Sequence, residues 1–171
     1  LTAHEMLDAL ERRFRAKVTL EGAVAEVHLE RKITALQREG QIARYERHDQ
    51  DGRPDFSVWV VGADPPLVIE CKNVRDTDEA YRSGGNVVAY KVETQKTRAA
   101  KGDPNSRYYS VGAFDVLAVC LGKKTEDWAQ FHFAAAADLA RRESAPSVLA
   151  VMHPVPLPGA PDMGPWSDDL G

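Results

Sequence analysis

The first forty residues carry apolar side chains at spacings of three and four, the period of an amphipathic helix. A first helix is predicted over residues 3–15, with an apolar face formed by Met6, Leu7, Leu10 and Phe14. A second helix is predicted from about residue 22 to 39, because the apolar stripe continues there and Gly40 follows as a C-terminal glycine. The chain is therefore expected to open with two helices.

After Gly40 the apolar period changes from about 3.6 residues to two, which is typical of strands. The run FDVLAVCL is almost continuously apolar and predicts a strand buried on both faces. Strands are predicted over 42–48, 54–61, 67–74, 114–121 and 128–134, and further helices over 87–98 and 137–143. This order of elements predicts an α/β fold in which helices flank a mixed β-sheet.

Length and composition predict one domain over residues 1–153, with its core at about 20–135. The chain has 171 residues, of which 43% are hydrophobic and 28% charged, enough apolar content for a buried core. From Pro154 to the end, prolines and aspartates are frequent, and we expect residues 154–171 to form a disordered tail or linker. The sequence does not open with methionine, so both an excised domain and a complete protein stay open.

Charge and cysteine content narrow the function classes. A net charge of −4 argues against a protein that coats nucleic acid by electrostatics alone. Two cysteines, Cys71 and Cys120, are too few for a disulfide framework or an all-cysteine zinc site, and they fit the reducing cytoplasm. No stretch approaches the ~18 consecutive apolar residues of a membrane span, so no membrane partner is expected.

The most informative feature is a Pro54-Asp55 pair followed, after a predicted strand–turn–strand, by Glu70-Cys71-Lys72. Alternation places Glu70 and Lys72 on one face of their strand. A turn centred near residues 63–64 would put Asp55 opposite Lys72 and diagonal to Glu70. A register slip of two residues would keep that face, whereas a slip of one would reverse it. We therefore expect an Asp, a Glu and a Lys to lie together.

These three side chains suit phosphodiester hydrolysis. Carboxylates are hard oxygen ligands for Mg²⁺, and the Cys71 carbonyl would supply a further oxygen. A divalent ion lowers the pKa of water and offsets the charge of the transition state, while a lysine can orient the water or stabilise the phosphate. The alternative is an ordinary charged pair on a strand, which is common for a Glu-x-Lys pattern.

Asp55, Glu70 and Lys72 in this frame resemble the signature of the PD-(D/E)XK nuclease superfamily, which has the restriction-endonuclease-like fold. The resemblance covers about residues 20–135. It implies that Asp55 and Glu70 bind Mg²⁺, with Mn²⁺ as a substitute, and that Lys72 is catalytic. It also implies an endonuclease acting on DNA, of the restriction or host-defence kind.

Two more positions fit the superfamily pattern. Its members often carry a glutamate on the first core helix, and the run from Gly22 to Glu26 with the apolar Leu29 and Ile33 matches that pattern. Glu26 would then join the catalytic and metal-binding residues, unless it is a solvated helix residue. Gln95 lies where some nuclease families have a glutamine, but the tyrosine expected four residues later is Ala99.

A basic segment follows the predicted helix at 87–98. Between residues 91 and 107 five cations face two anions, so the local charge is +3 in a chain of −4. We expect nucleic-acid contacts from Lys96, Arg98, Lys101 and Arg107. A solvated loop is the alternative.

Three functions stay open from the sequence. The first is the Mg²⁺-dependent DNA endonuclease. The second is a non-catalytic nucleic-acid-binding module of a larger defence protein or system, against which the complete Asp55, Glu70 and Lys72 set argues. The third is a nuclease that acts on RNA. The sequence does not decide between a monomer and a homodimer.

Overall fold

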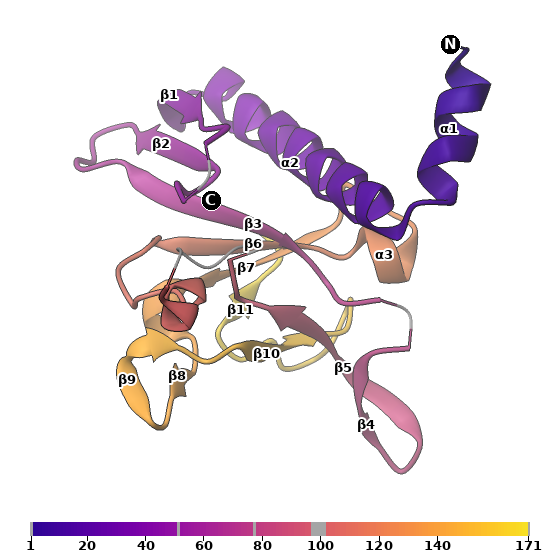
Figure 1. Ribbon diagram of the computed structural model, residues 1–171. Helices are drawn as coiled ribbons and strands as arrows, with labels where there is room; N and C mark the ends of the chain where they lie inside the picture. The colour runs from indigo at the N-terminus through magenta and orange to yellow at the C-terminus, as the bar shows by residue number, and fades with distance from the viewer. Residues whose placement is uncertain (1, 51, 77, 97–101, 171) are drawn as a thin grey trace.

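The computed structural model describes residues 2–50, 52–76, 78–96 and 102–170. Its centre is a six-stranded sheet in the order β1-β2-β3-β6-β7-β11 (Figure 1). Only β3 and β6 pair in parallel among these strands. The sheet strands are β1 (Ile42–Arg47), β2 (Phe56–Val60), β3 (Leu67–Asn73), β6 (Val116–Cys120), β7 (Phe131–Ala135) and β11 (Trp166–Ser167). The expected mixed sheet is confirmed.

Smaller elements surround this sheet. A second sheet has the order β10-β5-β4, and a short pair is formed by β8 and β9. These strands are β4 (Ala80–Ser83), β5 (Asn86–Glu93), β8 (Arg141–Arg142), β9 (Ala145–Leu149) and β10 (Met152–Pro156). The helices are α1 (Ala3–Glu11), α2 (Phe14–Arg38) and α3 (Gly122–Thr125), with 3₁₀ turns η1 (Pro104–Arg107) and η2 (Ala136–Asp138). None of the described helices is long and apolar enough to cross a membrane.

Strand β6 shows how the layers are held together, because it is buried on both faces. Its residues Ala118 and Cys120 belong to a core cluster with the apolar stripe of α2, whose buried members are Ala25, Leu29 and Ile33. Leu117 and Val119 point the other way and pack with residues of β5 and β10. The main sheet is therefore covered by α2 on one face and by the second sheet on the other.

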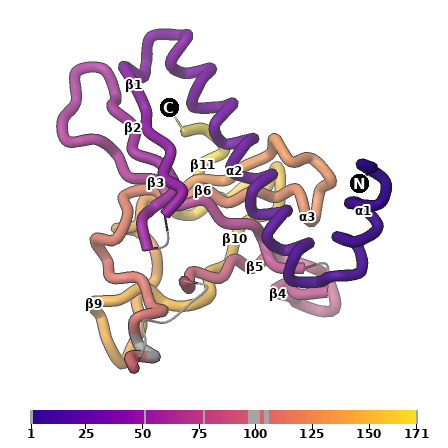
Figure 2. The backbone as a smooth tube through the Cα atoms, turned by 45° about the horizontal axis from the view of Figure 1, so that its top comes forward, coloured from indigo at the N-terminus to yellow at the C-terminus, as the bar shows by residue number. Residues whose placement is uncertain are grey.

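The two N-terminal helices are confirmed with different bounds. A capping box between Thr2 and Glu5 starts α1, which ends at Glu11. The second helix starts at Phe14, earlier than predicted, and ends just before Gly40, whose φ of 80° favours glycine. No glycine or proline marks the break between the helices, so periodicity alone did not reveal it. Both views show α1 standing away from the rest of the chain (Figures 1 and 2), and none of its residues is buried.

The predicted helix over 87–98 is wrong, because Asn86–Glu93 forms β5. Both Gly84 and Gly85 have positive φ, the turn geometry that joins two antiparallel strands, and β4 and β10 supply partners on both sides. The run is rich in valine, which favours an extended chain when partners exist. The helix predicted over 137–143 is also wrong, since η2 and β8 occupy it.

The C-terminal segment is ordered within the fold rather than a disordered tail. Strand β10 pairs with β5 over five residues, and β11 pairs with β7. Trp166 is buried against the core cluster on the second-sheet side. Prolines fit here because β10 is the edge strand of its sheet, where a missing N–H costs no ladder bond. Composition indicated a linker, but edge pairing accommodates the same prolines.

Candidate active site

The β2–β3 hairpin brings the predicted carboxylates together. Its ladder pairs Phe56 with Ile69 and Ser57 with Val68. Extending this register by one step sets Asp55 opposite Glu70, two residues from the register that the sequence predicted. The slip is even, so Asp55, Glu70 and Lys72 keep a common face. Glu70 and Lys72 share a face of β3, as predicted, and the observed register differs by two residues from the predicted one that would set Asp55 opposite Lys72.

Asp55 lies where β2 and β3 separate. The ladder ends at Phe56, and the Oδ2 of Asp55 accepts the backbone N–H of Cys71 at 2.7 Å. At this point the hydrogen-bond partner of β3 is therefore the Asp55 carboxylate and not the backbone of a neighbouring strand. A strand residue directs its N–H and C=O to the same side, so the Cys71 carbonyl also faces the gap that Asp55 fills. The Cys71 thiol is buried toward α2.

Glu70 is a buried carboxylate held by two donors. Only 4% of the residue is exposed, on the face of β3 that looks toward the second sheet. The Lys72 ammonium forms an ion pair with Glu70 Oε1, and the Tyr109 hydroxyl donates to the same oxygen at 2.5 Å. Oxygen Oε1 is therefore held by two donors, which restrict the rotation of the carboxylate.

The pKa values of the site residues follow from their burial and from the short distances between their charged groups. Burial, and then the charge of Glu70, raise the pKa of Asp55 to about 7. Burial alone would lower the pKa of the Lys72 ammonium, but the charge and hydrogen bond of Glu70, together with Tyr109 and Asp55, outweigh that effect and the pKa rises, so the lysine stays charged. Burial also raises the pKa of the Tyr109 hydroxyl, which keeps its proton to donate to Glu70. Two carboxylates with one ammonium leave an excess of negative charge that a cation would offset.

Glu26 approaches the site from α2. Its charge contributes to the raised pKa of Asp55, and its carboxylate pairs with Arg47 of β1 at 2.9 Å. Glu30, one turn later, accepts the Tyr45 hydroxyl at 3.1 Å. Both helix glutamates therefore contact β1, and Glu26 is the one whose charge reaches Asp55.

The donor set fits a hard divalent cation in part. Asp55, Glu70 and the Cys71 carbonyl offer oxygen atoms around one gap, which is the chemistry that Mg²⁺ prefers. Among the described residues no three Asp, Glu, His or Cys side chains are grouped closely enough to hold a metal by themselves. Glu26 would have to leave Arg47 to become a third carboxylate ligand. Backbone oxygen, water and phosphate would complete such a site.

The predicted basic segment is only partly described. Gln95 lies on an extended stretch instead of a helix and bridges to Tyr108. The Lys96 ammonium is 5.6 Å from the centre of the Tyr109 ring, and the Lys72 ammonium is at the same distance. Arg107 is tied to the backbone oxygen of Lys96. Arg98 and Lys101 lie outside the described residues, so their predicted contacts stay predictions.

Tyr109 is the site residue that the sequence analysis missed. It comes 39 residues after Glu70, with only its place after a basic segment to draw attention to it. Arg47, the partner of Glu26, carried no sequence signal either. Both residues reach the site from other elements, so no local motif contains them. Asn73, next to Lys72, ties β3 to α2 by donating to the Glu21 carbonyl at 3.1 Å.

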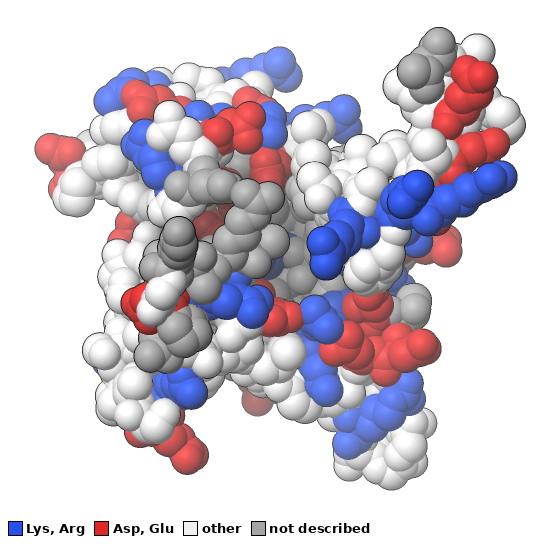
Figure 3. Space-filling model, viewed as in Figure 1, with Lys and Arg blue, Asp and Glu red and all other residues white. Residues whose placement is uncertain are grey.

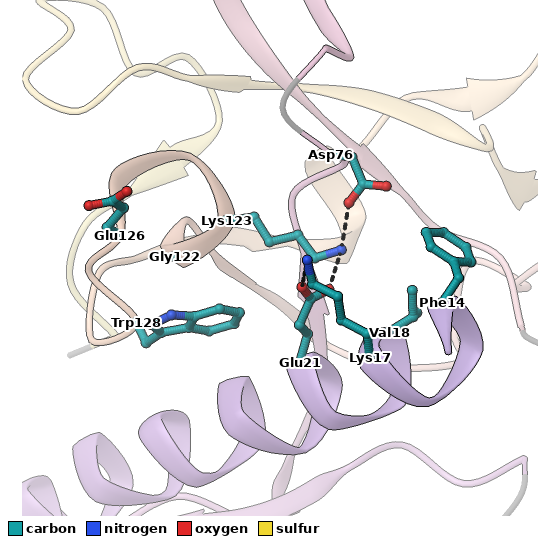
Figure 4. Close-up of a pocket in the computed structure, with 9 residues that line it drawn as sticks. All are labelled: Phe14, Lys17, Val18, Glu21, Asp76, Gly122, Lys123, Glu126 and Trp128. Carbon is teal, nitrogen blue, oxygen red and sulfur yellow. Dashed lines mark hydrogen bonds and ion pairs between the residues drawn. The ribbon is translucent and has the colours of Figure 1, made fainter. Parts of the chain in front are cut away.

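A separate pocket of about 480 Å³ lies between α2 and α3 (Figure 4). Phe14 and Trp128 stand at opposite ends of it, and the Lys123 ammonium bridges Glu21 at 2.8 Å and Asp76 at 2.9 Å. These ion pairs fasten the segment after β3 to α2. The carboxylates of the β2–β3 hairpin do not line this pocket.

Comparisons with known proteins give one structural match and no sequence match. No protein-family model matches the chain, and no curated protein is similar to it. The fold is similar to that of a bacterial homing endonuclease, I-Ssp6803I, with a TM-score of 0.52 and 14% sequence identity over 84% of this chain and 81% of that one. The mixed sheet flanked by helices is therefore a fold that a nuclease also adopts.

Proposed function

We propose that this chain is a metal-dependent endonuclease that hydrolyses phosphodiester bonds in DNA through a PD-(D/E)XK-type site. The observation that carries the proposal is the convergence of Asp55, Glu70 and Lys72 at the point where β2 and β3 separate. A buried carboxylate close to a second carboxylate is unfavourable for a purely structural hairpin, even next to a lysine. Active sites commonly collect such groups.

Similarity of fold supports the same proposal. I-Ssp6803I is a homing endonuclease, and its fold matches most of this chain. A fold alone does not specify chemistry, so the proposal depends on the side chains of the β2–β3 hairpin. The restriction or host-defence role and the homodimer raised by the sequence stay predictions.

The residues that would hold Mg²⁺ are Asp55, Glu70 and the carbonyl of Cys71, with Glu26 nearby. When bound there, Mg²⁺ would supply Lewis acidity and positive charge for phosphodiester hydrolysis. The charge of the metal would also favour the ionised form of Asp55, whose pKa is raised to about 7 by burial and by Glu70. We infer the same site for Mn²⁺.

Lys72 and Tyr109 have separate roles in this proposal. The ammonium of Lys72 is held beside Glu70, where it can bind a phosphate oxygen and stabilise its developing charge. The hydroxyl of Tyr109 positions Glu70 by donating to Oε1. The Lys96 ammonium also lies close to the Tyr109 ring, and it adds positive charge beside the site.

Plasmid cleavage in Mg²⁺ tests the proposal. The parent chain should nick or linearise plasmid DNA, EDTA should stop it, and Asp55→Asn and Lys72→Ala should each lower the rate by about 100-fold or more. Asp64→Asn, in the exposed β2–β3 turn, is the matched control and should cleave normally. Cleavage of RNA alone would point to an RNA nuclease. Binding without cleavage in either Mg²⁺ or Mn²⁺ would contradict the enzyme and favour a binding module.

A further inference from the structure

The β4–β5 hairpin extends beyond the sheet to which it belongs. Strand β10 pairs with β5 only from Ala89 to Glu93, so Asn86–Val88 of β5 and the end of β4, Arg82 and Ser83, continue past it. The hairpin projects at the lower right of Figure 1 as a two-stranded ribbon closed by Gly84-Gly85. Residues 82–86 at its tip are all exposed, and so is Val88.

The ribbon is positively charged in an acidic chain. Residues 80–92 contain Arg82 and Lys91 and no acidic residue, whereas the whole chain carries −4. Blue atoms mark this projection in Figure 3, below a cluster of red ones. Two of the acidic residues at its base, Glu79 and Glu93, are bound by Arg75. Arg82 is the cation of the projecting part, where it also donates to the Gly85 carbonyl at 3.1 Å, and Lys91 adds positive charge where β5 pairs with β10.

The tip also carries side chains that can read a base sequence. Ser83 pairs with Asn86 and shares its face, whereas Arg82 pairs with Val87 on the other face, so the tip presents polar groups on both sides. A guanidinium is the kind of group that recognises guanine in the major groove, and a side-chain amide the kind that recognises adenine. Val88 offers an apolar contact of the kind that meets the thymine methyl group. A two-stranded ribbon fits a groove about 12 Å wide.

Strand pairing connects the ribbon to the candidate active site. Val92 of β5 bridges to Val74, two residues after Lys72, and the Arg75 N–H donates to the Lys91 carbonyl at 2.8 Å. Beyond Glu93 the same segment passes Lys96, which contacts the Tyr109 ring. From Val92 to the tip at Asn86 the strand spans about 20 Å. That length corresponds to about six base pairs of duplex DNA.

We infer that the β4–β5 ribbon enters the major groove of duplex DNA and reads base edges about six base pairs from the bond that is cut. The inference rests on the proposed function and adds to it that the DNA is duplex and which element reads its sequence. Duplex RNA would not fit, because its major groove is too deep and narrow for side chains to read. Pairing of the β4 edge with a second copy of the chain is the competing use of the ribbon.

Sequence selection from a random duplex DNA library, in an Asp55→Asn background without cleavage, tests the inference. Arg82→Lys keeps the charge but loses the two-pronged donor geometry. The Arg82→Lys variant should lower the preference for selected over random DNA by about tenfold, through loss of preference at one base position. Its affinity for random DNA should stay unchanged. Lys91→Ala should weaken binding to every sequence and reduce the slope of log affinity against log salt by about one unit. Arg38→Ala, at the far end of α2, is the exposed control.

The outcomes separate this inference from the proposed function. Loss of base preference in Arg82→Lys and in Asn86→Ala, with unchanged thermal unfolding, supports the ribbon as the reader even if the parent chain never cleaves. Cleavage by the parent chain with base preferences that neither variant changes would overturn the inference and leave the enzyme intact. Equal affinity for duplex RNA, or a change of oligomeric state by light scattering without a change of base preference, would overturn it as well.

Discussion

Replacing Asp55 with asparagine should stabilise the metal-free protein while it destroys the proposed site. Asparagine has nearly the same shape and keeps an oxygen that can accept the Cys71 N–H, the 2.7 Å bond that Asp55 makes. It has no charge to oppose Glu70 and no ionised carboxylate to desolvate. The substitution therefore removes the two largest unfavourable effects on an ionised Asp55, burial of its charge and repulsion by Glu70, and leaves its hydrogen bond in place.

The size and sign of the effect follow from the pKa of Asp55. In the folded protein burial and the charge of Glu70 raise that pKa from 3.8 to about 7, so the folded state binds more protons than the unfolded state between these values. The contribution of Asp55 to wild-type stability is therefore greatest at low pH and falls as the pH rises toward about 7. At about 1.4 kcal/mol per pKa unit, the total loss is at most about 4 kcal/mol, of which about 2 kcal/mol falls between pH 5 and 7.

Denaturant unfolding of both proteins in EDTA, at intervals from pH 5 to 8, measures this difference. The stability advantage of Asp55→Asn should grow by up to about 3 kcal/mol across the range. Adding Mg²⁺ at pH 8 should stabilise the wild type, because a ligand that binds only the folded state stabilises it, and should do little for the variant. An advantage that does not change with pH would refute the reasoning. Asp64→Asn should show neither effect.

Three further predictions concern Glu26 and the packing of two other parts of the fold. Glu26→Gln should lower plasmid cleavage by about tenfold or more, since Glu26 acts on Asp55, while Glu30→Gln should lower it much less; equal losses would contradict this distinction. Gly122→Ala should lower the free energy of unfolding by about 1–3 kcal/mol, because its Cβ would lie 2.6 Å from Trp128; unchanged thermal unfolding would count against it. Trp166→Ala should cost about 3–5 kcal/mol in denaturant unfolding, as expected for a buried aromatic residue and not for a disordered tail.

Local patterns determined the parts of this protein that depend on neighbours in the sequence. The stripe of Ala25, Leu29 and Ile33 predicted the buried face of α2, and it is buried. Alternation predicted the β2–β3 hairpin and the common face of Asp55 and Glu70. Both predictions rest on the fixed periods of helix and strand, which hold wherever one face is buried.

Tertiary structure decided what local patterns leave ambiguous. Asn86–Glu93 could have been helical by its polarity pattern, but β4 and β10 satisfy its backbone groups as a strand. The proline-rich end is ordered only because β5 and β7 present edges on which it pairs. Tyr109 reaches Glu70 across 39 residues of chain. Each outcome depends on a partner that is distant in sequence, and the free energy of that pairing outweighs the local preference.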